Sequence, residues 1–185
     1  MKAPTPIMAA VHPMGWVFSL VILFSAAMNL DAREVRNVIL FIGDGMGSEH
    51  IRAAELGSGS NFQFRSFPSV ASFATRSADS RITDSAAAST AFATGRKVNN
   101  GVISMALPGT GAALQTVLEY FKSKGKRTGL ITTSFLTDAT PAAFAAHEIS
   151  RLNRDPIASD YLTTSRPDLL LGGGDIVFDP VDADP

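Results

Sequence analysis

The sequence predicts a layered α/β fold built around a mostly parallel sheet. Two observations lead to this prediction: short apolar runs alternate along the chain with helix-like segments, and the runs end abruptly in glycine turns. The run at 37–42 is rich in β-branched residues and stops at Gly43, and the run at 168–171 stops at Gly172. Continuous apolar runs of this kind are typical of strands that are buried on both faces of a parallel sheet.

Each expected element follows from a local signal. Small residues favour a slender helix that ends at Gly95, and Thr140 followed by Pro141 is a helix start with Thr as the cap and Pro at the first position. The Asn-Asn-Gly sequence at 99–101 marks a tight turn. The expected elements, in chain order, are a strand at 37–42, a helix at 47–56, a Gly/Ser-rich loop at 57–60, a strand at 67–75, a helix at 86–94, a helix at 112–123, a strand at 127–133, a helix at 140–149 and a strand at 168–171.

Composition excludes several classes of protein. The 185 residues include 16 Lys and Arg and 17 Asp and Glu, which gives a formal net charge of -1. The chain therefore lacks the excess of positive charge with which proteins bind the phosphates of nucleic acids. Because there is no cysteine, disulfide scaffolds, thiolate zinc sites and cysteine nucleophiles are also excluded. A metal site in this chain must therefore use oxygen ligands or one of the 3 histidines.

Residues 1–27 have the three regions of a secretory signal peptide. Lys2 precedes an apolar run at 17–24, and small residues follow up to Ala27, after which we place the cleavage. The alternative is a membrane anchor, but the apolar run is well short of the roughly 20 residues that a spanning helix needs. We therefore expect residues 28–185 to be exported to the periplasm or outside the cell, with no stable membrane span.

Candidate metal ligands lie in the turns that follow two predicted strands, where ligands gather in open α/β sheets. Asp44 stands between glycines after the first strand and can hold Mg²⁺ or Zn²⁺, or it can simply cap the next helix. Asp138 and Thr140 follow the strand at 127–133 and offer a carboxylate and a hydroxyl, oxygen ligands of the kind that Mg²⁺ prefers. Thr140 is equally well explained as a helix cap.

Ser85 is the candidate nucleophile, because it opens the small-residue helix, where backbone N–H groups and the helix dipole face an approaching anion. A serine held beside a metal can ionise and attack a phosphorus or carbonyl centre. The alternative is an ordinary cap, for which Asp84 or Ser85 would serve. Arg151, expected at the far end of the helix opened by Pro141, can donate two parallel hydrogen bonds to a phosphate or remain a solvated cation.

The histidines do not support a Ser/His/Asp triad. His50 and His147 fall inside predicted helices, and neither has a second histidine at metal-ligand spacing. We expect both to be structural, because neither has a reason to reach Ser85.

Four segments, taken together and in order, resemble alkaline phosphatases. The resemblance extends to Arg151 and to the run at 169–174, so it covers nearly everything after the leader. One small departure is Ser89, because the family prefers Gly or Ala before Thr90. Each motif alone is a modest signal, but four motifs in the same order and with similar spacing to those of the family are highly specific for it. The segments are 37–47, 82–90 with the Thr-Gly pair at 94–95, 99–101 and 138–143.

The resemblance implies a layered α/β/α fold and a phosphomonoesterase with two Zn²⁺ and one Mg²⁺. By position, Asp44 corresponds to the carboxylate that bridges Mg²⁺ and one Zn²⁺, and Ser85 corresponds to the nucleophile that becomes phosphoserine. Asp138 and Thr140 correspond to residues of the Mg²⁺ site, and Arg151 to the arginine that clamps the phosphate oxygens. The implied substrates are small-molecule phosphate monoesters, without nucleic acid. Homodimers are common among similar proteins, although these residues reveal no interface.

The family's remaining zinc ligands, and a Glu for Mg²⁺, belong to a downstream half that is absent from these residues. After Gly174 only residues 175–185 remain, and they contain no histidine. Residues 28–185 therefore look like the N-terminal part of a catalytic domain, and we expect this chain alone to be inactive and poorly folded. Two alternatives stay open: a non-catalytic exported protein that keeps a phosphate- or Mg²⁺-binding turn, and a sister phosphodiesterase of the same superfamily.

Overall fold

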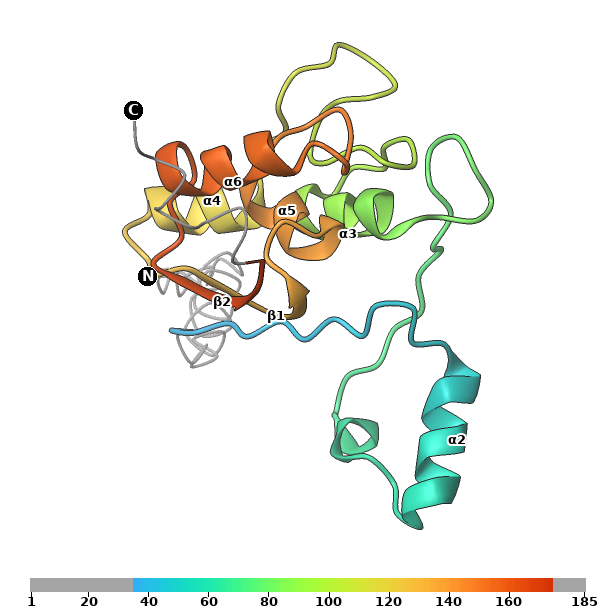
Figure 1. Cartoon of the computed structure of the whole chain (residues 1–185). Helices are drawn as coiled ribbons and strands as arrows, with labels where there is room; N and C mark the ends of the chain where they lie inside the picture. The colour runs from blue at the N-terminus through green and yellow to red at the C-terminus, as the bar shows by residue number, and fades with distance from the viewer. Residues whose placement is uncertain (1–34, 175–185) are drawn as a thin grey trace, which may run out of the picture. The chain divides into compact units, whose positions relative to one another are not determined.

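The computed structural model describes residues 35–174 (Figure 1). Residues up to Ile42 and residues from Gly43 onward form two separate units, which are described separately. The predicted signal peptide and its cleavage after Ala27 lie outside the described residues. The described elements are α2 (Ser48–Ser58), the 3-10 turn η1 (Gln63–Ser66), α3 (Ser85–Thr94), α4 (Val117–Ser123), β1 (Gly129–Phe135), α5 (Ala139–Ala145), α6 (Arg154–Thr163) and β2 (Leu169–Gly173).

Strands β1 and β2 form a parallel pair, which confirms the predicted fold class (Figure 1). Gly129 pairs with Leu169 at the start of the ladder, and a bulge shifts the register before the last pair, Phe135 with Gly173. A methyl group at Gly172 would lie 2.6 Å from a side-chain carbon of Thr132. The prediction that the strand ends in a turn at Gly172 is therefore wrong: β2 continues through Gly173, and the missing side chain at Gly172 allows the two strands to approach closely.

Helix α5 lies at the centre of the second unit, where it contacts α3, α4, α6 and β1 (Figure 1). The packing is close because small residues occupy the contact between α3 and α5, and α5 has every residue buried except Thr140. The last carbonyls of α5 accept hydrogen bonds from two buried hydroxyls, Ser104 to Ala143 and Thr116 to Phe144, each at 2.6 Å. The orientation of α5 is thus set at its C-terminal end.

Two of the strand predictions are wrong, because the part of the chain that the structure describes forms no strand at either place. The runs at 37–42 and 67–75 have no strand assignment, and their apolar side chains are largely exposed, with Val38 at 72% and Phe41 at 88% exposure. The reason is that β-propensity measures how well a side chain suits a pleated sheet, whereas a strand needs a partner for its backbone N–H and C=O groups. Between residues 35 and 174, no strand pairs with either run.

Two predicted helices are shorter than expected, because their caps differ. The helix predicted at 112–123 begins at Val117, since Thr116 and Glu119 form a capping box in which each side chain accepts the other's backbone N–H. The helix predicted at 140–149 covers only α5, and Asp138 rather than Thr140 caps it, accepting the Ala139 N–H at 2.8 Å. His147 and Arg151 therefore lie beyond this helix.

The structure adds two elements, η1 and α6, that the sequence motifs do not predict. Helix α6 buries Ile157, Ala158 and Tyr161, which are spaced so that they lie on one helix face. No element is predicted for this segment from the sequence. In the described part of the chain, no helix is long and apolar enough to cross a membrane.

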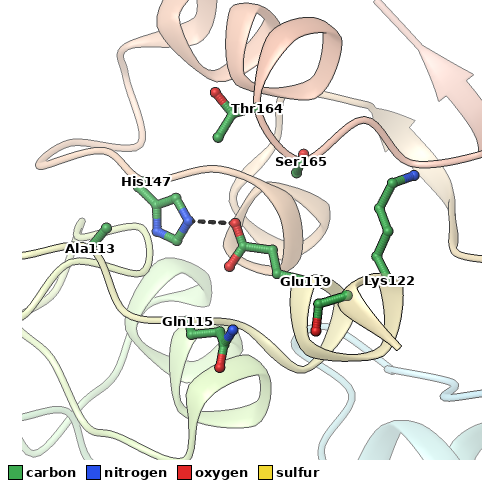
Figure 2. A pocket seen from close by; sticks show the side chains of 8 residues that line it. Ala113, Gln115, Glu119, Lys122, His147, Thr164 and Ser165 are labelled. Atoms are coloured by element: carbon green, nitrogen blue, oxygen red, sulfur yellow. Dashed lines mark hydrogen bonds and ion pairs between the residues drawn. The ribbon is translucent and has the colours of Figure 1, made fainter. Parts of the chain in front are cut away.

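In the second unit, His147 forms an ion pair with Glu119, and both residues line a surface pocket (Figure 2). Its Nε2 lies 2.8 Å from a Glu119 carboxylate oxygen, and its Nδ1 lies 3.0 Å from the Ser104 carbonyl oxygen. Both partners are acceptors, so both ring nitrogens donate only when the imidazole is protonated. Burial lowers the pKa of His147, but hydrogen bonds and the charges of Glu119 and Asp160 outweigh it and raise the pKa above its ordinary value.

This pair predicts a pH-dependent contribution to stability. The pKa of Glu119 is raised by burial but lowered further by hydrogen bonds from His147 and Thr116, so its net pKa lies below the ordinary 4.5. The contribution of Glu119 is present above about 4.5, and that of His147 is present below its ordinary 6.5 and is lost as pH rises through the raised value. The pair therefore stabilises the fold most between these two pH values.

We expect Glu119→Gln to reduce the free energy of unfolding by about 1–2 kcal/mol near pH 6, and by less at pH 9. The difference shrinks because the glutamine amide can donate to neutral His147 at high pH. Denaturant unfolding of the product of the complete gene at several pH values measures it, with Glu49→Gln, which changes an exposed acid of α2, as the control. A deficit that grows from pH 6 to pH 9 would contradict the ion pair.

Candidate active site

Asp44 contacts two of the other residues that the sequence singled out. The Ser85 hydroxyl donates to one of its carboxylate oxygens at 3.0 Å, and the Thr140 hydroxyl donates to the other at 2.8 Å. Asp44 lies in a turn in which Gly45 adopts the left-handed conformation, with φ of 65°. The cap of α2 is Gly47, so Asp44 does not cap that helix.

Ser85 is the first residue of α3, and a neighbour performs the capping role. The Asp84 carboxylate accepts the Ala87 N–H at 2.9 Å, which satisfies one of the unpaired donors at the start of the helix. The Ser85 hydroxyl is instead directed to Asp44. Of the two roles considered for this serine, the structure assigns the cap to Asp84 and leaves the hydroxyl at the N-terminal end of the helix.

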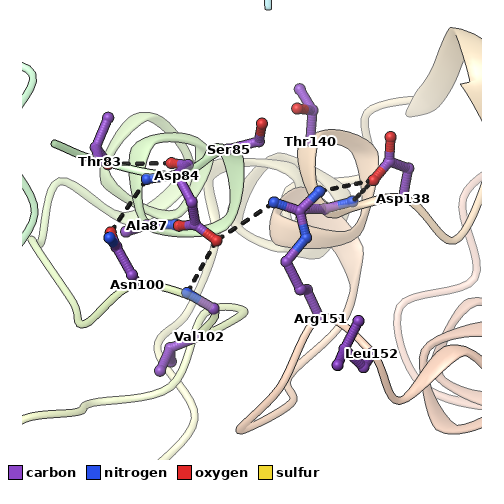
Figure 3. Close-up of polar contacts among 12 residues, drawn as sticks. Thr83, Asp84, Ser85, Ala87, Asn100, Val102, Asp138, Thr140, Arg151 and Leu152 are labelled. Atoms are coloured by element: carbon purple, nitrogen blue, oxygen red, sulfur yellow. Dashed lines mark hydrogen bonds and ion pairs between the residues drawn. The ribbon is translucent and has the colours of Figure 1, made fainter.

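Arg151 links the caps of α3 and α5 (Figure 3). One guanidinium nitrogen lies 3.3 Å from the Asp84 carboxylate, and another lies 3.0 Å from the Asp138 carboxylate. The alternative in which Arg151 is a solvated cation at a helix end is therefore wrong. The single guanidinium charge is thus shared between two carboxylates, and Ser85 lies next to it at the N-terminus of α3, which carries a partial positive charge.

Asp138 is held as a carboxylate by its hydrogen bonds. Burial raises its pKa, but the Ala139 N–H, the Ser134 hydroxyl and the Arg151 guanidinium lower it further, so the net pKa lies below the ordinary 3.8. The Ser134 hydroxyl donates to the second carboxylate oxygen at 3.0 Å. Ser134 was missed in the sequence, because a serine near the end of a strand gives no signal that it contacts a carboxylate four residues later.

The oxygen atoms around Asp44 fit part of a hard-cation site. A carboxylate and hydroxyls are the donors that Mg²⁺ uses, usually with several waters. Within residues 35–174, however, no group of three or more His, Cys, Asp or Glu residues is arranged to hold a metal ion. Because a zinc site normally takes three or four protein ligands, the described residues do not supply two complete zinc sites.

Comparisons with known proteins agree with the resemblance found in the motifs. A model of the family described as alkaline phosphatase matches residues 35–184. Alkaline phosphatase 4 of Bacillus subtilis is 40% identical over 173 residues, which cover 85% of this chain and 37% of that protein. Streptomycin-6-phosphate phosphatase of Streptomyces griseus is 35% identical, over 75% of this chain and 36% of that protein.

Solved structures of similar proteins share the fold. The alkaline phosphatase from the Antarctic bacterium TAB5 matches with a TM-score of 0.72 and 35% identity, covering 77% of this chain and 41% of that one. A mutant of the same enzyme with Mg bound in its M3 site gives the same TM-score and covers 40% of that chain. The chain thus spans about two fifths of the length of these relatives.

Proposed function

The chain belongs to the alkaline phosphatase family, and from this premise we propose that the protein which contains it hydrolyses phosphate monoesters through a phosphoserine intermediate. The contact between Ser85 and Asp44 carries the proposal: a serine hydroxyl at a helix N-terminus donates to a carboxylate at 3.0 Å. Arg151 supports it, because it lies across the two neighbouring caps and can receive an anion there.

In the proposed reaction the Ser85 oxygen attacks the phosphorus and loses its proton, while the bond from phosphorus to the substrate's alcohol oxygen breaks. The alcohol leaves with a proton, and water then hydrolyses the phosphoserine to release inorganic phosphate and restore Ser85. The Arg151 guanidinium and the N–H groups at the start of α3 hold the phosphoryl oxygens. Asp84 and Asp138 orient the guanidinium through the contacts described above.

The family is metal-dependent, and we propose two Zn²⁺ and one Mg²⁺ for this protein. Asp44 would help to hold Mg²⁺ and one Zn²⁺, and Asp138 and Thr140 would belong to the Mg²⁺ site. When bound, divalent ions supply Lewis-acid stabilisation and lower the pKa of an attacking hydroxyl or water. Because the described residues hold only part of such a centre, we propose that its remaining ligands come from outside these 185 residues.

The location and assembly of the protein are proposed from the leader and from the family. The signal-like sequence of residues 1–27 supports export to the periplasm or outside the cell. Small-molecule phosphate monoesters are the proposed substrates, and a homodimer is the proposed assembly. Sedimentation of the secreted protein measures the assembly, and N-terminal sequencing of that protein shows whether cleavage follows Ala27.

The experiment that tests the function compares the product of the complete gene with the 185-residue chain, each purified and supplied with Zn²⁺ and Mg²⁺. We expect the complete product to release phosphate from p-nitrophenyl phosphate, and the chain alone to stay at background. Zinc-dependent turnover by the chain alone would contradict an incomplete centre. Equal turnover of bis(p-nitrophenyl) phosphate would favour a phosphodiesterase, and phosphate or Mg²⁺ binding without turnover would favour a non-catalytic protein.

A further inference from the structure

The turn at 99–101 contacts the backbone immediately before Ser85. The side-chain oxygen of Asn100 accepts the Asp84 N–H at 3.1 Å, and its amide nitrogen donates to the Ile82 carbonyl oxygen at 2.9 Å. Figure 3 shows the Asn100 side chain beside Asp84 at the start of α3. A single carboxamide therefore holds both a donor and an acceptor of the segment that leads into Ser85.

The backbone of the same turn reaches two further residues of the candidate site. The backbone N–H of Gly101 donates to an Asp84 carboxylate oxygen at 3.0 Å. The Gly101 carbonyl oxygen accepts a hydrogen bond from the backbone N–H of Arg151 at 2.7 Å. Gly101 has a φ of 85°, which only glycine adopts readily, so the turn depends on this residue. The Asn100 N–H is in turn accepted by Asp79 at 2.9 Å.

Apolar packing does not hold the segment before Ser85. Ile82 is 81% exposed, and Asp84 is more than a quarter exposed at its side chain. Polar contacts must therefore determine where this backbone lies. A misplacement of a reacting group by about 1 Å can reduce a rate about 10²-fold. The contacts of Asn100 therefore matter for the position of the Ser85 hydroxyl.

We propose that Asn100 is a positioning residue for Ser85: its carboxamide fixes the backbone at 82–84 and thereby keeps the Ser85 hydroxyl at Asp44. The kinetic consequence rests on the proposed function, whereas the hydrogen bonds to Asp84 and Ile82 do not. The Gly101 contacts to Asp84 and Arg151 come from the backbone, so a substitution at Asn100 leaves them in place. Loss of the side chain should therefore slow attack by Ser85 more than it weakens the binding of phosphate.

The test uses Asn100→Ala in the product of the complete gene, with Asn99→Ala as the matched control in the same turn. No side-chain hydrogen bond of Asn99 is present among residues 35–174. Three quantities are measured: kcat/KM for p-nitrophenyl phosphate per active site, with sites counted by acid-trapped phosphoserine; the inhibition constant of inorganic phosphate; and the hydrogen-exchange rates of the backbone amides at 82–87.

For Asn100→Ala we expect kcat/KM to fall about 10-fold, the inhibition constant of phosphate to change by less than about 3-fold, and exchange to accelerate at 82–87 alone. Asn99→Ala should match the wild type in all three. Unchanged exchange at 82–87, an equal loss of phosphate binding, or faster exchange throughout α3 to α6 would overturn the proposal. If the wild type lacks monoesterase activity, the proposed function fails, and the exchange rates still decide the role of Asn100.

Discussion

Ser85→Ala is expected to reduce phosphate release from monoesters by at least about 10³-fold and to abolish covalent labelling by phosphate. The hydroxyl that this change removes is the one that contacts Asp44 at the start of α3. The fold should be retained, because Asp84 caps the helix. Inactivity of this variant would then report the missing nucleophile rather than an unfolded protein.

The measurement combines steady-state turnover with acid-trapping of the phosphoserine in the product of the complete gene. Ser89→Ala is the matched control, because Ser89 is buried in the same helix at 3% exposure and has no assigned role in the reaction. We expect this control to keep wild-type activity and labelling. Acid-stable phosphate on the Ser85→Ala protein, or turnover near the wild-type rate, would show that another residue is the nucleophile.

Asp44→Asn is expected to reduce kcat/KM by about 10²- to 10³-fold and to lower the amount of divalent metal that the protein retains. The two hydroxyls donate to different carboxylate oxygens, and asparagine replaces one of these oxygens with an NH₂ group that cannot accept a hydrogen bond. It also lacks the negative charge that a cation requires. The expected loss is therefore one of metal affinity together with the alignment of Ser85 and Thr140.

Metal content after dialysis and activity as a function of added Mg²⁺ and Zn²⁺ measure this effect. Glu49→Gln is the control, because it removes a nearby exposed carboxylate from the first turn of α2 without touching the cluster at Asp44. Partial recovery of the Asp44→Asn variant at high metal concentration would support a ligand role. Wild-type metal content combined with wild-type activity would show that Asp44 does not hold the metal.

Local chemistry in the sequence predicted those parts of the fold that depend on neighbouring residues. The small residues at 86–94 and Gly95 predicted α3, which the structure extends by one residue to Ser85. The apolar run before Gly172 predicted a parallel strand, and β2 confirms it with a shift of one to two residues. The motifs, by their order and spacing, predicted the family, which the comparisons confirm.

The sequence also selected the candidate site residues, although their roles stay predictions. The sequence could not predict that Asp44 contacts Ser85 and Thr140. These residues come from separate segments and meet only when α3 and α5 pack together. The sequence also did not predict the ion-pair partners of Arg151. Its guanidinium reaches both caps because α5 ends at Ala145 and the chain then passes beside Gly101.

The sequence by itself determined which segments can form helices, which residues can cap or turn them, and to which family the chain belongs, because these properties depend on side chains near one another in the chain. Only the tertiary structure decided which apolar runs become strands. The run at 169–173 is a strand because β1 supplies its hydrogen-bond partners, whereas no strand among the described residues pairs with the runs at 37–42 and 67–75. Pairing and burial depend on what lies across from a segment, and no local pattern contains that information.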